Sequence, residues 1–422
     1  MPRRWRYPLN RMTLKVSSPD STAAAEAFYE RTFQITFSIW LAFSIASVSF
    51  LFSPAANIVF KVVKIFLVAL NVIAAFYYYR FNGITKATIQ TWVVAAISIA
   101  ICLRALGVYY CFGVFFLAVG RHFNLTKTLK LSLCVTIVSL AFIVVLSLIG
   151  LIPDYVEYNP SRIRHYLGFR YSLFSGQICF ICICMMAVIR GKNIKLWESI
   201  LCAAILYLVY EATDDRLSFW LSVLVLFVLV AIAAINRVHP DLVISKPLVA
   251  RLGIWANVIA VLLFLVPILL TVFYSPASSF MQALNEFLGN RLALGLNGLK
   301  EFGLSIFGQR LELVGNGLDI NGIPDQGTYN YIDSTPMLLI IRYGLIFTVG
   351  FLVLQATAIK VLWAEREYVL VFVLLVIALH STIDDLCLAL YFNEFQFAYF
   401  GCLAVMLGEP NAFLGQTPDP SI

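Results

Sequence analysis

Apolar runs of about 20 residues, the length that crosses a bilayer as an α-helix, recur along most of the chain and are separated by short polar segments. The runs are continuous, whereas a transmembrane β-barrel would show alternation in segments of about 10 residues. The pattern therefore predicts an all-α polytopic membrane protein with about twelve transmembrane helices, over residues 33–53, 57–79, 88–104, 106–120, 129–152, 173–189, 196–212, 217–236, 252–274, 335–356, 368–385 and 389–408.

The third and fourth predicted spans are the least clearly divided pair. Only Arg104, Ala105 and the nearby Gly107 separate them, so one long helix with a re-entrant piece is an alternative. The large segment 275–334 is different, because it leans polar over about 60 residues, and long loops of this kind are usually functional. Helical spacing of Leu, Phe and Gly over 285–303 predicts short helices within it. We expect this loop to cover the spans as a cap.

The spans divide the chain into three parts. We expect a basic cytoplasmic tail over 1–32, a single transmembrane domain over 33–408, and a second cytoplasmic tail over 409–422 that is short, contains proline and is disordered. An even number of spans places both termini on the same side. Of the 30 lysines and arginines, 19 fall in segments that this topology puts inside and 8 in segments outside. Because cytoplasmic loops carry an excess of these residues, both termini are predicted to be cytoplasmic.

Composition narrows the class of protein. Hydrophobic residues make up 61% of the chain and charged residues 13%, against roughly 25% charged in soluble domains. This excludes a soluble globular domain, a disordered chain and a disulfide scaffold. The nine cysteines lie in or at the ends of apolar runs without ligand spacing, so we expect no disulfide and no metal site. The chain has no P-loop and no dinucleotide fingerprint, and we expect no cofactor, no nucleic-acid partner and no ATP-driven transport by this chain alone.

Arginines in the predicted outer segments are the first candidates for chemistry. Seven of the eight outer cations are arginine, and arginine binds phosphate with two hydrogen bonds. A single one of them is equally well explained by pairing with an outer carboxylate, as for Arg216 beside Asp214 and Asp215. For the set we favour an anion site at the outer face, formed by Arg162, Arg164, Arg216, Arg291 and Arg310.

Asp333 is the candidate for acid–base chemistry. It directly precedes the tenth predicted span, where a carboxylate can orient or deprotonate a hydroxyl. An alternative and compatible role is the N-cap of that span, because Asp333 and Ser334 precede Thr335-Pro336. His165, which lies among the arginines of the second outer loop, is a less favoured base.

Four sequence elements resemble a known family. They are Arg164 to Phe169 before a span; Thr213 to Arg216 at the start of a span; LNEFLGNRLALG followed by LSIFGQRLELVGNG; and YNYIDSTPMLLIIRYG, with Asp385 and Asn393 further on. Their order and spacing over about residues 160–400 resemble the Wzy-type polysaccharide polymerases of capsule and exopolysaccharide pathways, within the polymerase and O-antigen ligase superfamily. The resemblance implies a GT-C-like glycosyltransferase in the cytoplasmic membrane, with its active site on the extracytoplasmic face.

The resemblance also implies a substrate and roles for residues. Such proteins join oligosaccharide repeat units carried on undecaprenyl diphosphate, alongside a flippase and a chain-length regulator. Arg216 and Arg291 would hold the pyrophosphate, with Arg162, Arg164 and Arg310 lining the same mouth. The related ligases carry a histidine where this chain has Asp333, and that departure favours a polymerase.

Three other functions stay open. One is an O-antigen-ligase-like transferase that attaches glycan to a lipid or wall polymer. Another is a flippase or transporter of lipid-linked oligosaccharide, which would be expected to show two related halves. No similarity between 33–236 and 252–408 is evident. The third is a membrane scaffold without chemistry, which the set of outer arginines disfavours.

Overall fold

The computed structural model describes residues 19–159, 162–239, 245–409 and 413, and these are mostly helical. The first half of the chain forms α1 (Pro19–Ala46), α2 (Pro54–Asn82), α3 (Lys86–Ala105), α4 (Val108–Gly120), α5 (Leu125–Leu148), β1 (Val156–Asn159), β2 (Arg162–His165), α6 (Leu173–Arg190), η1 (Gly191–Asn193), α7 (Leu196–Thr213) and α8 (Arg216–Val238). The second half forms α9 (Lys246–Val272), α10 (Ser279–Phe287), α11 (Arg291–Phe302), α12 (Thr335–Leu338), the π-helical turn η2 (Leu339–Tyr343), α13 (Gly344–Ala364), α14 (Tyr368–His380), η3 (Leu386–Leu388), η4 (Leu390–Phe392) and α15 (Gln396–Leu407).

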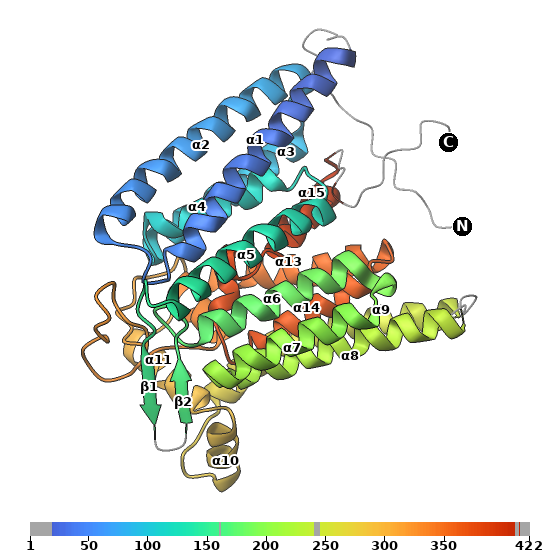
Figure 1. Ribbon diagram of the computed structural model, residues 1–422. Coiled ribbons are helices and arrows are strands. Elements are labelled where there is room, and N and C mark those ends of the chain that lie inside the picture. The colour runs from blue at the N-terminus through green and yellow to red at the C-terminus, as the bar shows by residue number, and fades with distance from the viewer. Residues whose placement is uncertain (1–18, 160–161, 240–244, 410–412, 414–422) are drawn as a thin grey trace.

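The long helices pack side by side in one bundle, and smaller elements gather at one of its ends (Figure 1). We call this the capped end; it carries the β1–β2 hairpin, α10, α11 and the irregular segment 303–334. Short helices were predicted in the large loop over residues 285–303. Helix α11 lies within this range, whereas α10 begins earlier, at Ser279.

Eight helices in the described part of the chain are long and apolar enough to cross a membrane. Apolar helices of 10–17 residues lie in α4, α14 and α15. The protein is therefore a multi-pass helical membrane protein. The count of twelve spans, their orientation and the side of the termini stay predictions.

Short polar residues set where several of these helices begin. Ser53 accepts a hydrogen bond from the Ala56 amide and precedes Pro54, the first residue of α2. Asn124 caps α5 in the same way through the Lys127 amide, and Asp215 caps α8 through the Ser218 amide. These contacts satisfy amide groups that the first turn of a helix leaves without a partner.

Two separate helices, rather than one long one, occupy the region of the third and fourth predicted spans. Gly107 adopts a φ of +86° between α3 and α4, a conformation that favours glycine and ends the first helix. Helix α4 has 13 residues, which gives it a length of about 20 Å, less than the hydrocarbon thickness of about 30 Å.

Helix α6 lies at the centre of the bundle. About two thirds (67%) of its most apolar stretch is buried, against 39% or less in the other seven long apolar helices of the described chain. It packs against α5, α7, α8 and α14. Aromatic rings fill the neighbouring layer, where Phe33 and Phe37 of α1 contact Phe116 of α4 and Phe397 of α15.

The all-α prediction missed an antiparallel β-hairpin. Strands β1 and β2 pair with Glu157 opposite Arg164 and with Tyr158 opposite Ile163. Opposite charges and apolar–aromatic pairs across two strands stabilise such a ladder. Short hairpins of this kind carry a weak sequence signal, because four-residue strands are too short for a clear alternation.

The predicted disordered C-terminal tail is wrong for two of its residues. Glu409 and Phe413 are buried. Glu409 forms an ion pair with Arg121 at the end of α4, and the ring of Phe413 lies against Gly401 of α15. The remaining tail residues lie outside the described part of the chain.

Candidate functional site

A pocket of about 320 Å³ lies at the capped end, between the segment 315–333 and the turn that follows α14. We call it the aspartate pocket, because four aspartates line it. Six tyrosines line it as well, and Arg342 is the one lysine or arginine among its described lining residues. These charged and aromatic members are Asp325, Asp333, Asp384, Asp385, Tyr110, Tyr171, Tyr329, Tyr331, Tyr343, Tyr391 and Arg342.

Asp333 and Arg291, both predicted as site residues, are in contact. The Arg291 Nε lies 3.3 Å from Asp333 Oδ2, and the Tyr329 hydroxyl donates to the same oxygen at 3.0 Å. Arg291 is the first residue of α11 and Asp333 lies just before α12, and α11 packs against the turn η2 that continues α12. Gly298 permits this approach, since a Cβ there would lie 2.5 Å from the Ile332 side chain.

Asp333 does not act as a helix cap. Ser334 occupies the N-cap position of α12, and the Asp333 carboxylate faces Arg291 and Tyr329 instead. Burial raises the pKa of Asp333, and the positive charge of Arg291 partly opposes that rise. A carboxylate with a raised pKa is a better proton acceptor near neutral pH than an exposed one.

Asp384 and Asp385 lie in the turn after α14. The Thr335 hydroxyl donates to the Asp384 backbone carbonyl at 2.8 Å, and the Tyr331 hydroxyl donates to Asp385 Oδ2 at 2.9 Å. Burial raises the pKa of Asp384 to about 7, with a further rise from the charge of Asp333. Burial and the charge of Asp384 raise the pKa of Asp385 as well. Three neighbouring carboxyl groups thus hold protons at a higher pH than exposed aspartates do.

Arg291 also lines an apolar groove of about 290 Å³ between α9 and α11. Its guanidinium donates to the Gly289 carbonyl through Nη1 at 2.8 Å and to the Ile383 carbonyl through Nε at 3.3 Å. We call this the Arg291 groove; its apolar lining consists of Ile259, Leu262, Leu263, Val266, Pro267, Leu270, Leu288, Leu292 and Ile383. The contact between Arg291 and Asp333 therefore joins an apolar groove to a polar pocket.

Three other predicted arginines form a separate group around Asp214. Arg216 makes hydrogen bonds to both carboxylate oxygens of Asp214, and Arg162 Nη1 lies 3.9 Å from one of them. Arg164 donates to the Asp214 backbone carbonyl at 3.3 Å. None of the three is among the residues that line the aspartate pocket. Tyr171 lines the aspartate pocket, and the charges of both Asp333 and Arg164 act on its hydroxyl.

The other two predicted site residues lie apart from the pocket. His165 Nδ1 lies 2.6 Å from Asp154 Oδ2 at the end of β2, and its side chain is partly exposed. Arg310 is exposed in the segment 303–334. Neither residue lines the aspartate pocket.

Sequence reasoning missed Arg342. The sequence pattern places Arg342 inside an apolar span. A charged residue in that setting is a functional candidate by default, and this could have identified Arg342 from the sequence. The π-helical turn η2 places its side chain at the pocket, where Nε lies 3.3 Å from the Ala105 carbonyl. The side-chain amide of Gln309 donates to the Ile341 carbonyl at 3.0 Å, which satisfies one acceptor of this irregular turn.

The fold and the site together define a multi-pass helical membrane protein with a polar pocket at one end of its bundle. No protein-family model matches this chain, and neither a curated protein nor a solved structure shows significant similarity to it.

Proposed function

We propose that this protein is a glycosyltransferase of the Wzy type, which joins polyprenyl-diphosphate-linked oligosaccharide repeat units into a polysaccharide at the outer face of the cytoplasmic membrane. The observation that carries the proposal is the contact between Arg291 and Asp333. It brings together a cation for a diphosphate, a carboxylate for a hydroxyl and an apolar groove for a lipid tail.

The reaction exchanges one bond at the anomeric carbon of the donor. The bond from that carbon to the diphosphate oxygen breaks, and a bond to a hydroxyl oxygen of the acceptor forms. The hydroxyl proton passes to the Asp333 carboxylate. The electron pair of the broken bond leaves on the diphosphate, which stays attached to its lipid, and Arg291 stabilises the negative charge that develops there.

The lining of the aspartate pocket suits a saccharide. Carboxylates accept hydrogen bonds from sugar hydroxyls, and tyrosines offer both an aromatic face and a hydroxyl. Asp384 and Asp385 would orient the sugar rings beside Asp333. The three arginines around Asp214 do not line the aspartate pocket, so they would attract the diphosphate without contacting the reacting bond. Asp214 already partly neutralises their charge; they are Arg162, Arg164 and Arg216.

The test compares Arg291→Ala and Asp333→Asn with Lys300→Ala, which removes an exposed positive charge from the same helix as Arg291. In cells whose only copy of the chain is the variant, we measure the size distribution of lipid-linked and surface glycan. We expect the first two variants to slow polymer formation by about 10²–10³-fold and to accumulate single lipid-linked repeat units. Lys300→Ala should give polymer of normal length.

Other outcomes would favour other functions. Long polymer that stays on the lipid carrier would indicate a ligase-like transferase. Repeat units trapped on the inner face would indicate a flippase. Normal polymer length from both Arg291→Ala and Asp333→Asn, with the proteins present in the membrane at normal levels, would overturn the site.

A further inference from the structure

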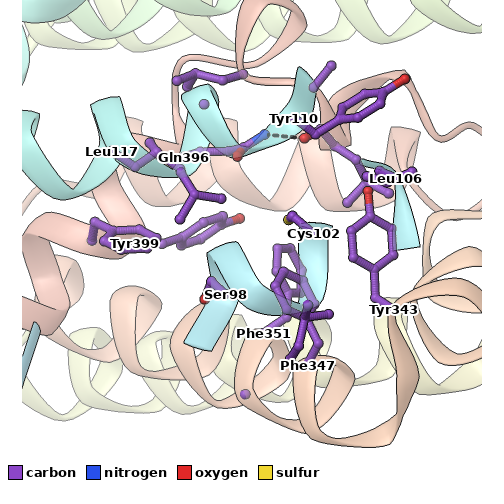
Figure 2. A pocket seen from close by; sticks show the side chains of 18 of the residues that line it. Ser98, Cys102, Leu106, Tyr110, Leu117, Tyr343, Phe347, Phe351, Gln396 and Tyr399 are labelled. Carbon is purple, nitrogen blue, oxygen red and sulfur yellow. Dashed lines mark hydrogen bonds between the residues drawn. The ribbon is translucent and has the colours of Figure 1, made fainter. Parts of the chain in front are cut away.

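A second apolar space lies on another side of the aspartate pocket. It is a cavity of about 270 Å³ between α3, α4, α13 and α15, and Figure 2 shows side chains from these elements, among them Cys102, Phe351 and Tyr399, surrounding it. We call it the α3–α13 cavity. It shares six lining residues with the aspartate pocket, so the two spaces adjoin; these are Leu106, Tyr110, Tyr343, Leu388, Ala389 and Tyr391.

The cavity also opens sideways out of the bundle. Ile97 of α3 and Ile346 of α13 line it, and their side chains are 50% and 45% exposed. Gly350 lines it as well, and a Cβ at that position would meet no atom within 4 Å. Since α3 and α13 belong to apolar stretches long enough to cross a membrane, this opening faces lipid.

The lining is apolar apart from a few polar groups. Lys64 is its one charged member in the described part of the chain, and its Nζ lies 4.4 Å from the ring centroid of Phe60 and 5.0 Å from that of Phe112. Aromatic faces of this kind attract an ammonium group. The cavity therefore fits a hydrocarbon chain better than a sugar.

Arg342 stands where the cavity meets the aspartate pocket. It lines the pocket, and the next residue, Tyr343, lines both spaces. Its side chain is partly exposed, and only its Nε takes part in the contact to Ala105. The two Nη groups leave a fork of donors of the kind that binds phosphate oxygens.

We infer that the α3–α13 cavity holds the isoprenyl tail of a second lipid-linked substrate, the acceptor unit, with its diphosphate against Arg342. The donor occupies the Arg291 groove, so two lipid-anchored saccharides reach the same three aspartates from two sides. The identity of the occupant rests on the function proposed above. A polymerase needs two such sites, because both of its substrates are lipid-linked, whereas a flippase moves one.

The test uses a polyprenyl diphosphate that carries a diazirine on its isoprenyl chain, added to the purified full chain in lipid nanodiscs. After irradiation, mass spectrometry maps the labelled peptides. We expect labels on α9, from the Arg291 groove, and on α3 and α13, from the cavity. Gly350→Leu places a side chain into the cavity and should lower labelling of α3 and α13 by about tenfold, while labelling of α9 persists.

Four further variants complete the test. Ile97→Trp fills the cavity from α3 and should act like Gly350→Leu if that variant fails to fold. Val353→Trp adds a large side chain on the exposed face of α13, outside the cavity lining, and should leave both sets of labels unchanged. Arg342→Ala should weaken labelling of α3 and α13, while Arg291→Ala should weaken labelling of α9.

The outcomes separate this inference from the proposed function. Labels confined to α9, or labels on α3 and α13 that survive Gly350→Leu and Ile97→Trp, would overturn the second lipid site. A transferase that binds one lipid-linked substrate, in the Arg291 groove, would still agree with such labels. Labels in both places, together with normal polymer in cells lacking the chain, would support the two lipid sites and refute polymerisation.

Discussion

Burial controls the chemistry of the aspartate pocket at the scale of single residues. Asp333, Asp384 and Asp385 lie close enough for their charges to interact, and burial raises the pKa of each. A proton shared among neighbouring carboxyl groups belongs to the group rather than to one residue. The pocket is thus suited to accept a proton near neutral pH, where an exposed aspartate would be a weak base.

Asp384 should make the stability of the protein depend on pH. Its pKa is raised from 3.8 to about 7 in the folded protein, chiefly by burial, so the folded state binds this proton more tightly than the unfolded chain does. Its stabilising contribution is fully present below pH 4 and is lost as pH rises through about 7. Asp384→Asn should therefore raise the thermal unfolding temperature more at pH 8 than at pH 5, because only part of this contribution has been lost at pH 5.

Thermal unfolding in nanodiscs at the two pH values measures this difference. Glu312→Gln, which removes an exposed carboxylate of the segment 303–334, serves as the control and should show no such dependence. If Asp384→Asn changed the unfolding temperature equally at pH 5 and pH 8, the raised pKa of Asp384 would not be the cause of the pH dependence.

The sequence predicted individual site residues better than their grouping. Arg291 was identified as one of the outer arginines and Asp333 by its place directly before the tenth predicted span, and they do meet. Arg216 was placed in the same mouth, but it pairs with Asp214 two residues away. Pairing of Arg216 with a neighbouring aspartate was the alternative that its position in the sequence offered. The contact between Arg291 and Asp333 depends instead on how helices pack, and position along the chain alone does not predict it.

At the scale of elements, the turn between α12 and α13 shows what hydropathy cannot predict. The apolar pattern predicted one span over 335–356, and the structure interrupts it with the π-helical turn η2. A π-turn adds one residue to a helical turn, and this shift is invisible in a pattern read at 3.6 residues per turn. Gly344 follows this turn with a φ of +85° and lies against Gly308 of the segment 303–334.

Gly344→Ala should disrupt this turn and displace Arg342. A Cβ at position 344 would lie 2.4 Å from the Gly308 nitrogen, and the left-handed backbone alone costs about 1–2 kcal/mol for a residue other than glycine. We expect a lower unfolding temperature and loss of labelling of the α3–α13 cavity. Gly350→Ala on the same helix is the matched control for the unfolding temperature, because its Cβ meets nothing and the change should be neutral or slightly stabilising. Wild-type stability and labelling in Gly344→Ala would refute this role.

At the scale of the whole molecule, an ion pair joins the end of the chain to the first half of the bundle. Arg121 follows α4, Glu409 follows α15, and both side chains are fully buried, with Nε and Oε2 2.9 Å apart. The Tyr79 hydroxyl accepts a further hydrogen bond from Arg121 at 3.1 Å. The Leu125 amide donates to the Phe413 carbonyl, which continues the same attachment. This attachment could not be predicted from the chain's pattern, since Arg121 and Glu409 lie 288 residues apart.

Glu409→Gln should destabilise the protein strongly. It leaves Arg121 buried with its charge uncompensated, and removal of one partner of a buried pair costs about 3–5 kcal/mol. Glu301→Gln, at an exposed position of α11, should change little. Unfolding by denaturant in micelles measures both, and a double change to Arg121→Met and Glu409→Leu should recover much of the loss. Equal stability of Glu409→Gln and Glu301→Gln would show that the pair contributes nothing.

The sideways opening of the α3–α13 cavity has a consequence for how the protein is supplied. A molecule that enters between α3 and α13 arrives by diffusion in the plane of the bilayer and never passes through the aqueous phase. Occupancy of the cavity is then set by the mole fraction of that lipid in the membrane, and the volume of surrounding buffer has no effect on it. Dilution of the bilayer with inert phospholipid, at constant total amounts of protein and lipid-linked substrate, should lower the reaction rate as effectively as removal of substrate.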